Sequence, residues 1–297
     1  MRLMVIFNPH AGHGRAKKII EPLKKYLTEK HAEVTWLLTA YPGHAVEIVA
    51  EAHLDHFDGV IAAGGDGTLF EIINGLHQNK SSHRPVLGVI PTGTGNAFAR
   101  ELGLSQDDWQ KAADIVSAGK TRMVDLGRFI TGDETRYFIN IIGCGFVSDV
   151  SATAHKLKIF GYFSYILGVF YRLIFLKSIQ MKLKTDKTEM NLKGIFIEVS
   201  NSRYTGKSFL MAPNAEIDDG FLDITILNKI GRFKLLKIFP TIFTGKHIHV
   251  PDITSFKARY IEIITNKPYI LTPDGELTGH TPVTIDVIKH GIKIFWP

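Results

Sequence analysis

The chain has 297 residues, of which 45% are hydrophobic and 22% are charged, and 35 basic against 29 acidic side chains give a formal net charge of +6. This length accommodates two domains, and this composition excludes disordered and fibrous proteins. The single cysteine, Cys144, excludes an internal disulfide and fits a reducing compartment. Cys144 lies in an apolar run, which favours a buried residue over a nucleophile. The N-terminus carries no signal-peptide pattern, so we expect a cytoplasmic protein.

The first 120 residues alternate between short apolar runs and segments of helical periodicity. We expect strands at residues 3–7, 34–38, 60–63 and 86–90. We expect helices at residues 16–27, 43–52, 68–76, 97–102 and 107–118, with Pro22 at a kink or near a helix start and Gly119 ending the last helix. Strands separated by helices predict an α/β domain, a parallel sheet with helices on both faces.

Three glycine-containing loops follow strands of this predicted sheet, at Asn8–Gly14, Gly64–Thr68 and Thr92–Asn96. Carboxyl ends of parallel strands share one edge, so these loops should be neighbours. Glycine lets backbone N–H groups approach a phosphate, and the N-terminus of the helix after Gly64–Thr68 adds its positive dipole. Asp66 lies between glycines, where it can reach a metal or a donor. Each loop alone could be an ordinary turn; together they indicate a nucleotide phosphate site.

The character of the chain changes after about residue 126. Strand-like segments follow at residues 136–143, 192–199, 221–227, 260–264, 269–271, 283–288 and 292–296, with helical regions at residues 148–176 and 232–243. This pattern predicts a mostly antiparallel β-sandwich with helical insertions. We place the domains at residues 1–127 and 128–297, with the last residues able to return to the first domain. No flexible linker marks the join, so we expect close packing and a cleft.

A basic and aromatic segment lies in the second domain. Residues 156–193 carry eight Lys and Arg against two acids, and the apolar stretch Ile159–Leu176 within it is interrupted by Arg172. Such a stretch disfavours a transmembrane helix, leaving a buried core helix or a helix facing an anionic membrane. Zinc-ligand spacing and RNA-binding aromatic signatures are absent from the sequence, so nucleic acid is not expected.

Two further segments gather carboxylates. Thr272–Glu276 reads either as a Pro-Asp-Gly turn or as a turn that presents Glu276 as a general base. Glu216–Phe221 carries three acids before a strand, and reads either as a solvated turn or as a site for a hard cation. From the residues alone, a turn is the better interpretation of both.

The ordered set of motifs resembles the diacylglycerol kinase and sphingosine kinase catalytic superfamily, most closely its bacterial soluble lipid kinases. The motifs are Asn8-Pro9-x-Ala-Gly-x-Gly, Gly64-Gly65-Asp66-Gly67-Thr68 with Glu71 and Asn74-Gly75, Gly93-Thr94-Gly95-Asn96, Asp219-Gly220 and Asp274-Gly275-Glu276. They run from residue 8 to residue 276. NAD kinases and phosphofructokinases share the Gly-Gly-Asp-Gly-Thr string but lack the remainder.

The resemblance implies a nucleotide-binding first domain and a lipid-substrate second domain, with ATP and Mg²⁺ as cofactors. It implies that Glu276 accepts the proton of the lipid hydroxyl and that Asp66 is the second catalytic residue. The residues implied to line the nucleotide are Asn8, Pro9, His10, Ala11, Gly12, Thr39, Gly64, Gly65, Asp66, Gly67, Thr68, Leu69, Phe70 and Thr94. Those implied to hold magnesium are Glu216, Asp219 and Phe221, the last through its backbone carbonyl.

Two positions depart from the family pattern. Phe70 stands where an asparagine is usual, which affects one polar nucleotide contact. Ala97 stands where diacylglycerol kinases carry an aspartate and the sphingosine kinase branch resembles Gly-Asn-Ala, which affects the substrate class. Glu216 stands where family members vary.

We therefore predict an ATP-dependent lipid kinase that phosphorylates a primary hydroxyl of diacylglycerol or a sphingoid-like alcohol, in phospholipid biosynthesis. The alternatives are a soluble-substrate kinase related to NAD kinase and a non-catalytic nucleotide or lipid sensor. Expected partners are the lipid alcohol, the inner face of the cytoplasmic membrane and a second copy in a homodimer. The apolar lipid pocket is expected near Tyr162, Phe163, Tyr165 and Leu167, or near residues 232–243.

Overall fold

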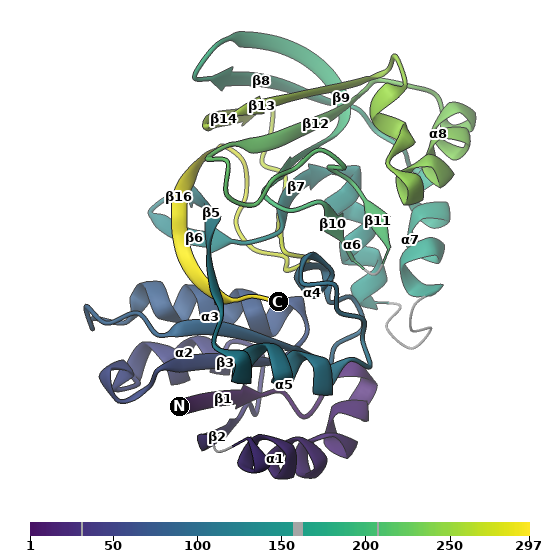
Figure 1. Cartoon of the computed structure of the whole chain (residues 1–297). Helices are drawn as coiled ribbons and strands as arrows, with labels where there is room; N and C mark the ends of the chain where they lie inside the picture. Colours follow the sequence, from purple (N-terminus) through teal and green to yellow (C-terminus); the bar gives the residue numbers. More distant parts are fainter. Residues whose placement is uncertain (31, 157–162, 207) are drawn as a thin grey trace. The chain divides into compact units, whose positions relative to one another are not determined.

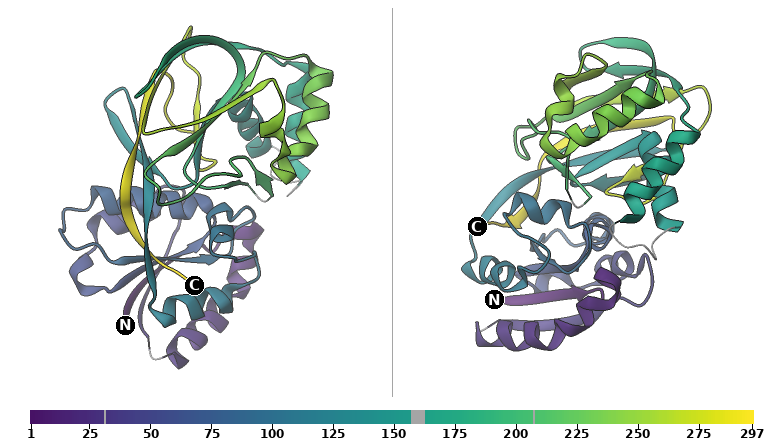
Figure 2. Two further views of the ribbon diagram at one scale, coloured as in Figure 1. Left: turned by 45° about the horizontal axis from the view of Figure 1, so that its top comes forward. Right: turned by 90° about the vertical axis from the view of Figure 1, so that its right-hand side faces the viewer.

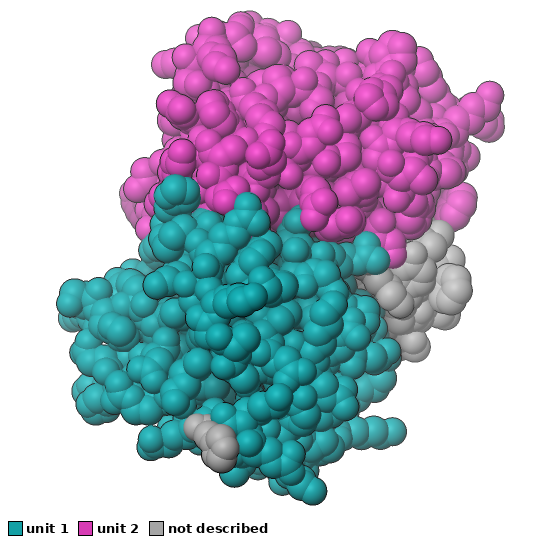
Figure 3. All heavy atoms as spheres, viewed as in Figure 1, with its two compact units in different colours: residues 1–124, 290–297 teal, residues 125–289 magenta. Residues whose placement is uncertain are grey.

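The computed structural model describes residues 1–30, 32–156, 163–206 and 208–297. The chain divides into two compact units, coloured separately in Figure 3. The first unit contains Met1–Val124 and His290–Pro297, and the second contains Asp125–Lys289. The division thus falls between residues 124 and 125, where the sequence suggested residue 127, and the C-terminal residues belong to the first unit.

The first unit is built on a parallel sheet. Its strands are β1 (Arg2–Phe7), β2 (Glu33–Leu38), β3 (Gly59–Gly64) and β4 (Val86–Pro91), in the order β4-β3-β1-β2 (Figure 1). Every neighbouring pair is parallel, and the end of β16 (Val283–Phe295) joins β4 in parallel at Ile294 and Leu87. β3 is buried along its whole length, as a strand covered on both faces must be. The predicted parallel sheet is confirmed.

Five of the described helices belong to the first unit, and four of them pack in pairs. The helices are α1 (Ile20–Glu29), α2 (His44–Glu51), α3 (Asp66–Gln78), α4 (Ala97–Glu101) and α5 (Trp109–Ala118), with 3-10 segments η1 (Ala11–Lys18) and η2 (Leu54–His56). α1 packs with α5 and α2 packs with α3 (Figures 1 and 2). Pro22 lies in the first turn of α1, where a missing N–H removes no helical bond. Gly119 ends α5 in the left-handed conformation, as predicted.

The second unit is mostly antiparallel, which confirms the predicted class. Its strands are most of β5 (Thr121–Thr131), β6 (Glu134–Phe138), β7 (Ile141–Gly145), β8 (Ile179–Thr185), β9 (Glu189–Ser200), β12 (Leu222–Asn228), β13 (Ile253–Ala258), β14 (Tyr260–Thr265), β15 (Leu271–Pro273) and the start of β16, with a small ribbon of β10 (Tyr204–Thr205) and β11 (Phe209–Leu210). β9 is central: β8 pairs with its first half, β7 with its second half and β12 with its other edge. All these pairings are antiparallel.

Several strand boundaries were predicted wrongly. The single strand expected at residues 136–143 is broken between β6 and β7, because Asp274 binds the backbone N–H groups of Ile139 and Asn140 there. The two strands expected at 283–288 and 292–296 are one strand, β16. β5, β8 and β13 were missed. The strict alternation of buried and exposed residues in β8 is the sequence signal that could have revealed it.

The helices of the second unit pack over an apolar cluster on one face of β9. They are α6 (Phe146–Lys156), α7 (Phe163–Ile174) and α8 (Arg232–Ile238), followed by η4 (Phe239–Thr244) and η5 (Lys246–His249). The cluster contains Val150, Val169, Phe196 and Leu235, among others. The side chains of Tyr162, Phe163, Tyr165 and Leu167, named above as pocket candidates, lie outside what the structure describes. Among the described residues, none of the helices is long and apolar enough to cross a membrane.

Candidate active site

The first loop is tied to the second at the carboxyl edge of the sheet. The Asn8 backbone N–H donates to the Ala63 carbonyl at 2.9 Å, and Asn8 Nδ2 donates to Thr68 Oγ1 at 3.2 Å. Asn8 Oδ1 accepts from the His10 N–H at 2.9 Å, which bends the chain out of β1. Gly12 has φ +58° and lies so close to the Thr92 carbonyl that a Cβ would stand 2.6 Å from that oxygen. Only glycine fits there.

The second and third loops pack backbone against backbone. The N–H groups of Thr92 and Gly93 donate to the Gly64 carbonyl at 2.9 and 3.2 Å. A Cβ on Gly93 would lie 2.4 Å from Gly65 Cα, so the two glycines allow this approach. The three loops are therefore neighbours, as predicted. Gly65 and Gly67 are partly exposed at the start of α3, where helical N–H groups lack intrahelical acceptors.

Asp66 makes contacts that the sequence did not predict. Its Oδ1 accepts from the Ala97 N–H at 2.7 Å and from the Phe98 N–H at 3.4 Å. Asp66 thereby caps α4, which follows the third loop. Asn96, in the left-handed conformation, closes that loop by bonding Gly93 through both ends of its side-chain amide. Asp66 thus positions the third loop, whatever further role it has.

The remaining expected nucleotide residues differ in exposure. Thr39 is buried and its N–H donates to the Phe7 carbonyl at 2.9 Å, which places the end of β2 beside the end of β1. Thr94 is half-buried. Leu69 and Phe70 are 2% and 5% exposed, so their side chains belong to the core. The aromatic ring at position 70 is accommodated by packing.

Glu71, which belongs to the second glycine motif, holds the start of a neighbouring helix. Its two oxygens accept the N–H groups of Gly43 and Ala45 at 2.8 and 3.1 Å. These groups lie at the start of α2, where N–H donors lack helical partners. Glu71 therefore joins α2 to α3. An acid one turn after a glycine loop is a signal that could have suggested such a cap.

In the second unit, Asp274 holds the turn that follows β15. Its carboxylate accepts three backbone N–H groups, from Ile139, Asn140 and Ile141, at 2.9–3.0 Å. The side chain is 7% exposed and the residue has φ +48°. Burial raises the pKa of Asp274 to about 6, although the three N–H groups favour its ionised form. Asp274 is a structural anchor that sequence reasoning treated only as part of a turn.

Glu276, two residues later, has a different environment. Its backbone N–H closes the turn on the Pro273 carbonyl at 2.8 Å, and the residue is half-buried. In the described parts of the chain, no hydrogen bond or ion pair is formed by its carboxylate. A carboxylate that is held by its backbone and free at its tip is able to accept a proton from a bound ligand.

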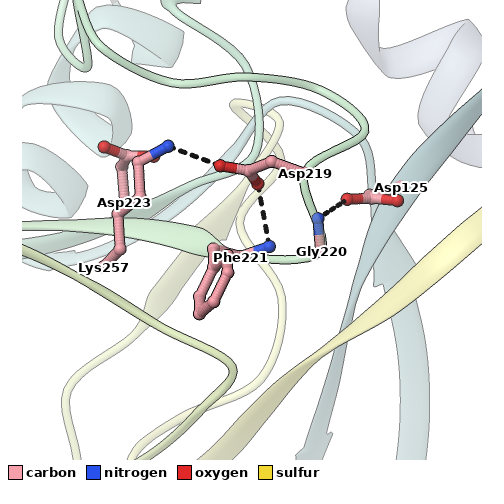
Figure 4. Close-up of polar contacts among 6 residues, drawn as sticks. All are labelled: Asp125, Asp219, Gly220, Phe221, Asp223 and Lys257. Atoms are coloured by element: carbon pink, nitrogen blue, oxygen red, sulfur yellow. Dashed lines mark hydrogen bonds and ion pairs between the residues drawn. The ribbon is translucent and has the colours of Figure 1, made fainter.

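The acidic loop before β12 is compensated by a lysine (Figure 4). Asp219 Oδ1 accepts from the Phe221 N–H at 2.9 Å, and Asp219 Oδ2 pairs with Lys257 Nζ at 2.6 Å. Lys257 also lies 3.5 Å from Asp223. The fully buried Asp125 accepts the Gly220 N–H at 2.6 Å and so fixes the loop from behind. Burial raises the pKa of Asp223 to about 6, and Lys257 opposes that shift.

As a metal site this loop is incomplete. Carboxylate oxygens at Glu216 and Asp219 and the Phe221 carbonyl are the hard donors that magnesium takes. Glu216 is exposed, however, and Lys257 already supplies a positive charge to Asp219. No group of three or more His, Cys, Asp or Glu side chains in the described residues is placed to hold a metal ion.

An apolar pocket lies in the second unit. Its described walls come from α6, α7, β9, the β10–β11 ribbon, α8 and η4, and include Phe146, Val150, Val169, Phe209 and Leu235. It contains about 440 Å³ of unfilled space, part of it open to solvent. The η4 contribution lies within residues 232–243, one of the two segments proposed from the sequence. Cys144 is buried in β7 of this unit, as predicted, and burial raises the pKa of its thiol to about 12, which disfavours the reactive thiolate.

Comparison with known proteins identifies the family. Residues 2–129 match the family model of the diacylglycerol kinase catalytic domain, and residues 140–296 match that of the YegS C-terminal NAD kinase beta sandwich-like domain. The diacylglycerol kinase of Bacillus subtilis is 32% identical over 298 residues, covering 100% of this chain and 96% of that protein. The chain belongs to the diacylglycerol kinase family. As a member it is a phosphotransferase of the lipid-kinase type.

Other members of the diacylglycerol kinase family agree in sequence and fold. The diacylglycerol kinase of Mycobacterium tuberculosis is 31% identical over 301 residues, covering 100% of this chain and 95% of that protein. A crystal structure of a putative diacylglycerol kinase from Bacillus anthracis superposes with a TM-score of 0.83 at 27% identity, covering 100% of this chain and 95% of that one. Both units therefore have counterparts within single family members.

Proposed function

We propose that this protein transfers the γ-phosphate of ATP to the primary hydroxyl of a lipid alcohol, diacylglycerol first among the candidates. The observation that carries the proposal is the packing of three glycine loops around the N-terminus of α3, within a diacylglycerol kinase catalytic domain. Phosphoryl transfer asks the protein mainly to position phosphates and to neutralise charge. The backbone N–H groups of the partly exposed Gly65 and Gly67 are suited to that task.

The nucleotide is proposed to contact the loop residues through their backbone. The proposed contacts come from the loop residues Asn8 to Gly12, Gly64 to Thr68 and Thr94. The buried side chains of Leu69 and Phe70 support these loops from the core. Asp66 is proposed to act in catalysis in addition to capping α4. The variant Asp66→Asn keeps an oxygen for the Ala97 N–H, so a large loss of turnover with unchanged thermal stability is the expected result. Full activity in that variant would reduce Asp66 to its structural contact.

Glu276 is proposed as the general base that accepts the proton of the lipid hydroxyl. Support comes from the contrast with Asp274: one acid of the turn is consumed by three backbone donors, and the other is free to act. General base catalysis is typically worth about 10²–10⁴-fold in rate.

Magnesium is proposed to enter with ATP, because Mg²⁺ in such enzymes is commonly held by one or two carboxylates together with substrate phosphates. It would neutralise phosphate charge. Asp219 is the carboxylate of the acidic loop best placed to hold it, with the Phe221 carbonyl and Glu216 as further oxygen donors. Lys257 would then have to release one Asp219 oxygen.

The apolar pocket of the second unit is proposed to take an acyl chain of the lipid. Each buried methylene contributes about 0.8 kcal/mol to binding. A pocket walled by Phe146, Val169 and Leu235 therefore favours the binding of an acyl chain. A soluble-substrate kinase would need a polar pocket here. The apolar walls therefore favour the lipid kinase over an NAD-kinase-like activity.

We further propose that the protein works at the inner face of the cytoplasmic membrane. Several large apolar side chains are exposed to solvent: Phe170, Tyr171 and Ile174 of α7, Phe175 directly after it, and Phe233 of α8, which is 85% exposed. The exposed cations Lys229, Arg232 and Lys237 lie next to α8 or on it, whereas Lys234 pairs with Asp252 at 2.5 Å. Apolar and cationic side chains together suit an anionic bilayer.

One assay tests the activity and its alternatives together. The purified chain is incubated with ATP, Mg²⁺ and either a lipid extract in detergent micelles, NAD, or no acceptor, and products are identified by mass. A lipid phosphomonoester is the expected product. Phosphorylation of NAD alone would support the soluble-substrate kinase, and nucleotide binding without any transfer would support a sensor. Flotation with vesicles, neutral or anionic, tests the membrane proposal; equal binding to both would remove its electrostatic part.

A further inference from the structure

One acidic side chain, Glu198, lies among the walls of the apolar pocket. It sits in β9 and is 5% exposed, and its Oε2 has no hydrogen-bond partner among the described residues. On the neighbouring strands it stands opposite Gly143 of β7 and Thr225 of β12. A Cβ on Gly143 would come within 3.1 Å of Glu198 Cγ, so the glycine makes room for the acid.

The described residues that line the pocket around Glu198 provide no positive charge. The described walls of the pocket contain no Lys, Arg or His, and Thr205 is the other polar side chain among them. The Thr225 hydroxyl, directly across the sheet from Glu198, is likewise buried and without a partner in the described parts of the chain. Buried polar atoms are normally satisfied, and of these two residues Glu198 is the one that lines the pocket, where a ligand could supply the missing hydrogen bond.

Desolvation determines the form of the acid. Burial raises the pKa of Glu198 to about 8, so the side chain is mostly protonated at neutral pH. A protonated carboxyl group carries one O–H donor and retains an acceptor oxygen. It pairs well with an uncharged oxygen acceptor, and an acyl chain alone would leave it unsatisfied.

We propose that Glu198 is the specificity-determining residue of this pocket, where its neutral carboxyl group donates a hydrogen bond to an ester carbonyl oxygen of the acceptor lipid. The proposal rests on the function proposed above and names its substrate class: an uncharged acyl ester. A sphingoid amine would require an ion pair in an apolar pocket, with both charges desolvated. A dialkyl ether offers a weaker acceptor at the same place.

The test compares three short-chain lipids in mixed micelles: dioctanoylglycerol, its dioctyl ether analogue and a sphingoid amine. Wild type is expected to show a KM for the ester about tenfold below that for the ether, with kcat similar, since one hydrogen bond is worth about that factor. Glu198→Leu should raise the ester KM to the ether value and leave the ether KM unchanged. Glu198→Gln keeps an N–H donor and should restore most of the preference.

The matched control is Thr205→Val, which removes the other polar side chain of the pocket walls and should not alter the ester-to-ether ratio. An unchanged ratio in Glu198→Leu, or a wild type that prefers the amine, would overturn the proposal. A wild type inactive on every lipid would instead contradict the proposed function. Displacement of the dye anilinonaphthalene sulfonate by ester and ether then reports the same preference without turnover, and an equal displacement by both would overturn the role of Glu198.

Discussion

In the first unit, the acid of the glycine motif binds backbone: Asp66 holds the N–H groups of Ala97 and Phe98. In the second unit, the Asp-Gly-Glu turn contains two acids, and their carboxylates have different environments. Asp274 binds three backbone N–H groups, whereas the carboxylate of Glu276 forms no hydrogen bond or ion pair in the described part of the chain. The difference shows that acids of the sequence motifs can serve to hold loops, and that two acids of one turn can be distinguished by what their carboxylates contact.

The most direct test of the difference between these two acids is a substitution of Glu276. Glu276→Gln is expected to lower kcat by about 10²–10⁴-fold, because an amide cannot accept the hydroxyl proton. ATP affinity and melting temperature should be unchanged, since the side chain makes no contact that the fold needs. Steady-state kinetics measures kcat, nucleotide titration measures the affinity for ATP, and thermal denaturation measures the melting temperature. Glu262→Gln, a half-buried acid of β14, is the matched control. Turnover near the wild-type value would remove Glu276 from catalysis.

The glycine loops are tested at Gly93. In Gly93→Ala the new methyl group would lie 2.4 Å from Gly65 Cα, so the second and third loops must separate. We expect ATP affinity to fall by at least tenfold and the free energy of unfolding to fall by about 1–3 kcal/mol, the usual cost of overpacking. Gly231→Ala is the control, because open space surrounds that glycine. Unaltered ATP binding would show that the loop contact does not shape the phosphate site.

Asp274 should behave in the opposite way to Glu276. Asp274→Ala leaves three buried N–H groups without their acceptor, so the free energy of unfolding should fall by about 1–3 kcal/mol or more. Asp274→Asn retains one acceptor oxygen and should lose less. Chemical denaturation of both, beside Glu276→Ala, measures the contrast. Equal losses at positions 274 and 276 would contradict the division between anchoring and free acids.

A pH dependence of stability is expected at Glu198. Burial raises the pKa of Glu198 in the folded state to about 8 from an ordinary 4.5. Between these two pH values the folded state keeps a proton that the unfolded state has released. The free energy of unfolding of wild type therefore falls as pH rises through this window, and Glu198→Gln avoids the loss. The melting temperature of Glu198→Gln should rise relative to that of wild type between pH 5 and pH 8, and the difference should stay constant above pH 8. A difference that is constant with pH would show that Glu198 is not buried as an acid.

Much of this protein was determined by its sequence. Apolar strands alternating with helical periodicity specify the parallel sheet, because strands covered on both faces must be apolar throughout. Once the sheet is parallel, loops that follow β1, β3 and β4 must share its carboxyl edge. The glycines at 12, 65 and 93 were recognisable for the same reason: a backbone that approaches another backbone closely leaves no room for a side chain.

Only the tertiary structure decided what each acid does. Asp66, Asp125 and Asp274 bind N–H groups that lie far away in the sequence, and those pairings follow from packing, which local patterns do not encode. The same holds for the lysine that compensates Asp219, and for the lack of a hydrogen-bond partner in the described residues at the Glu276 carboxylate and at Glu198 Oε2. The residue type alone does not reveal the environment of an aspartate or glutamate. Burial and hydrogen-bond partners determine whether its carboxyl group anchors a loop, keeps its proton or is free to accept one.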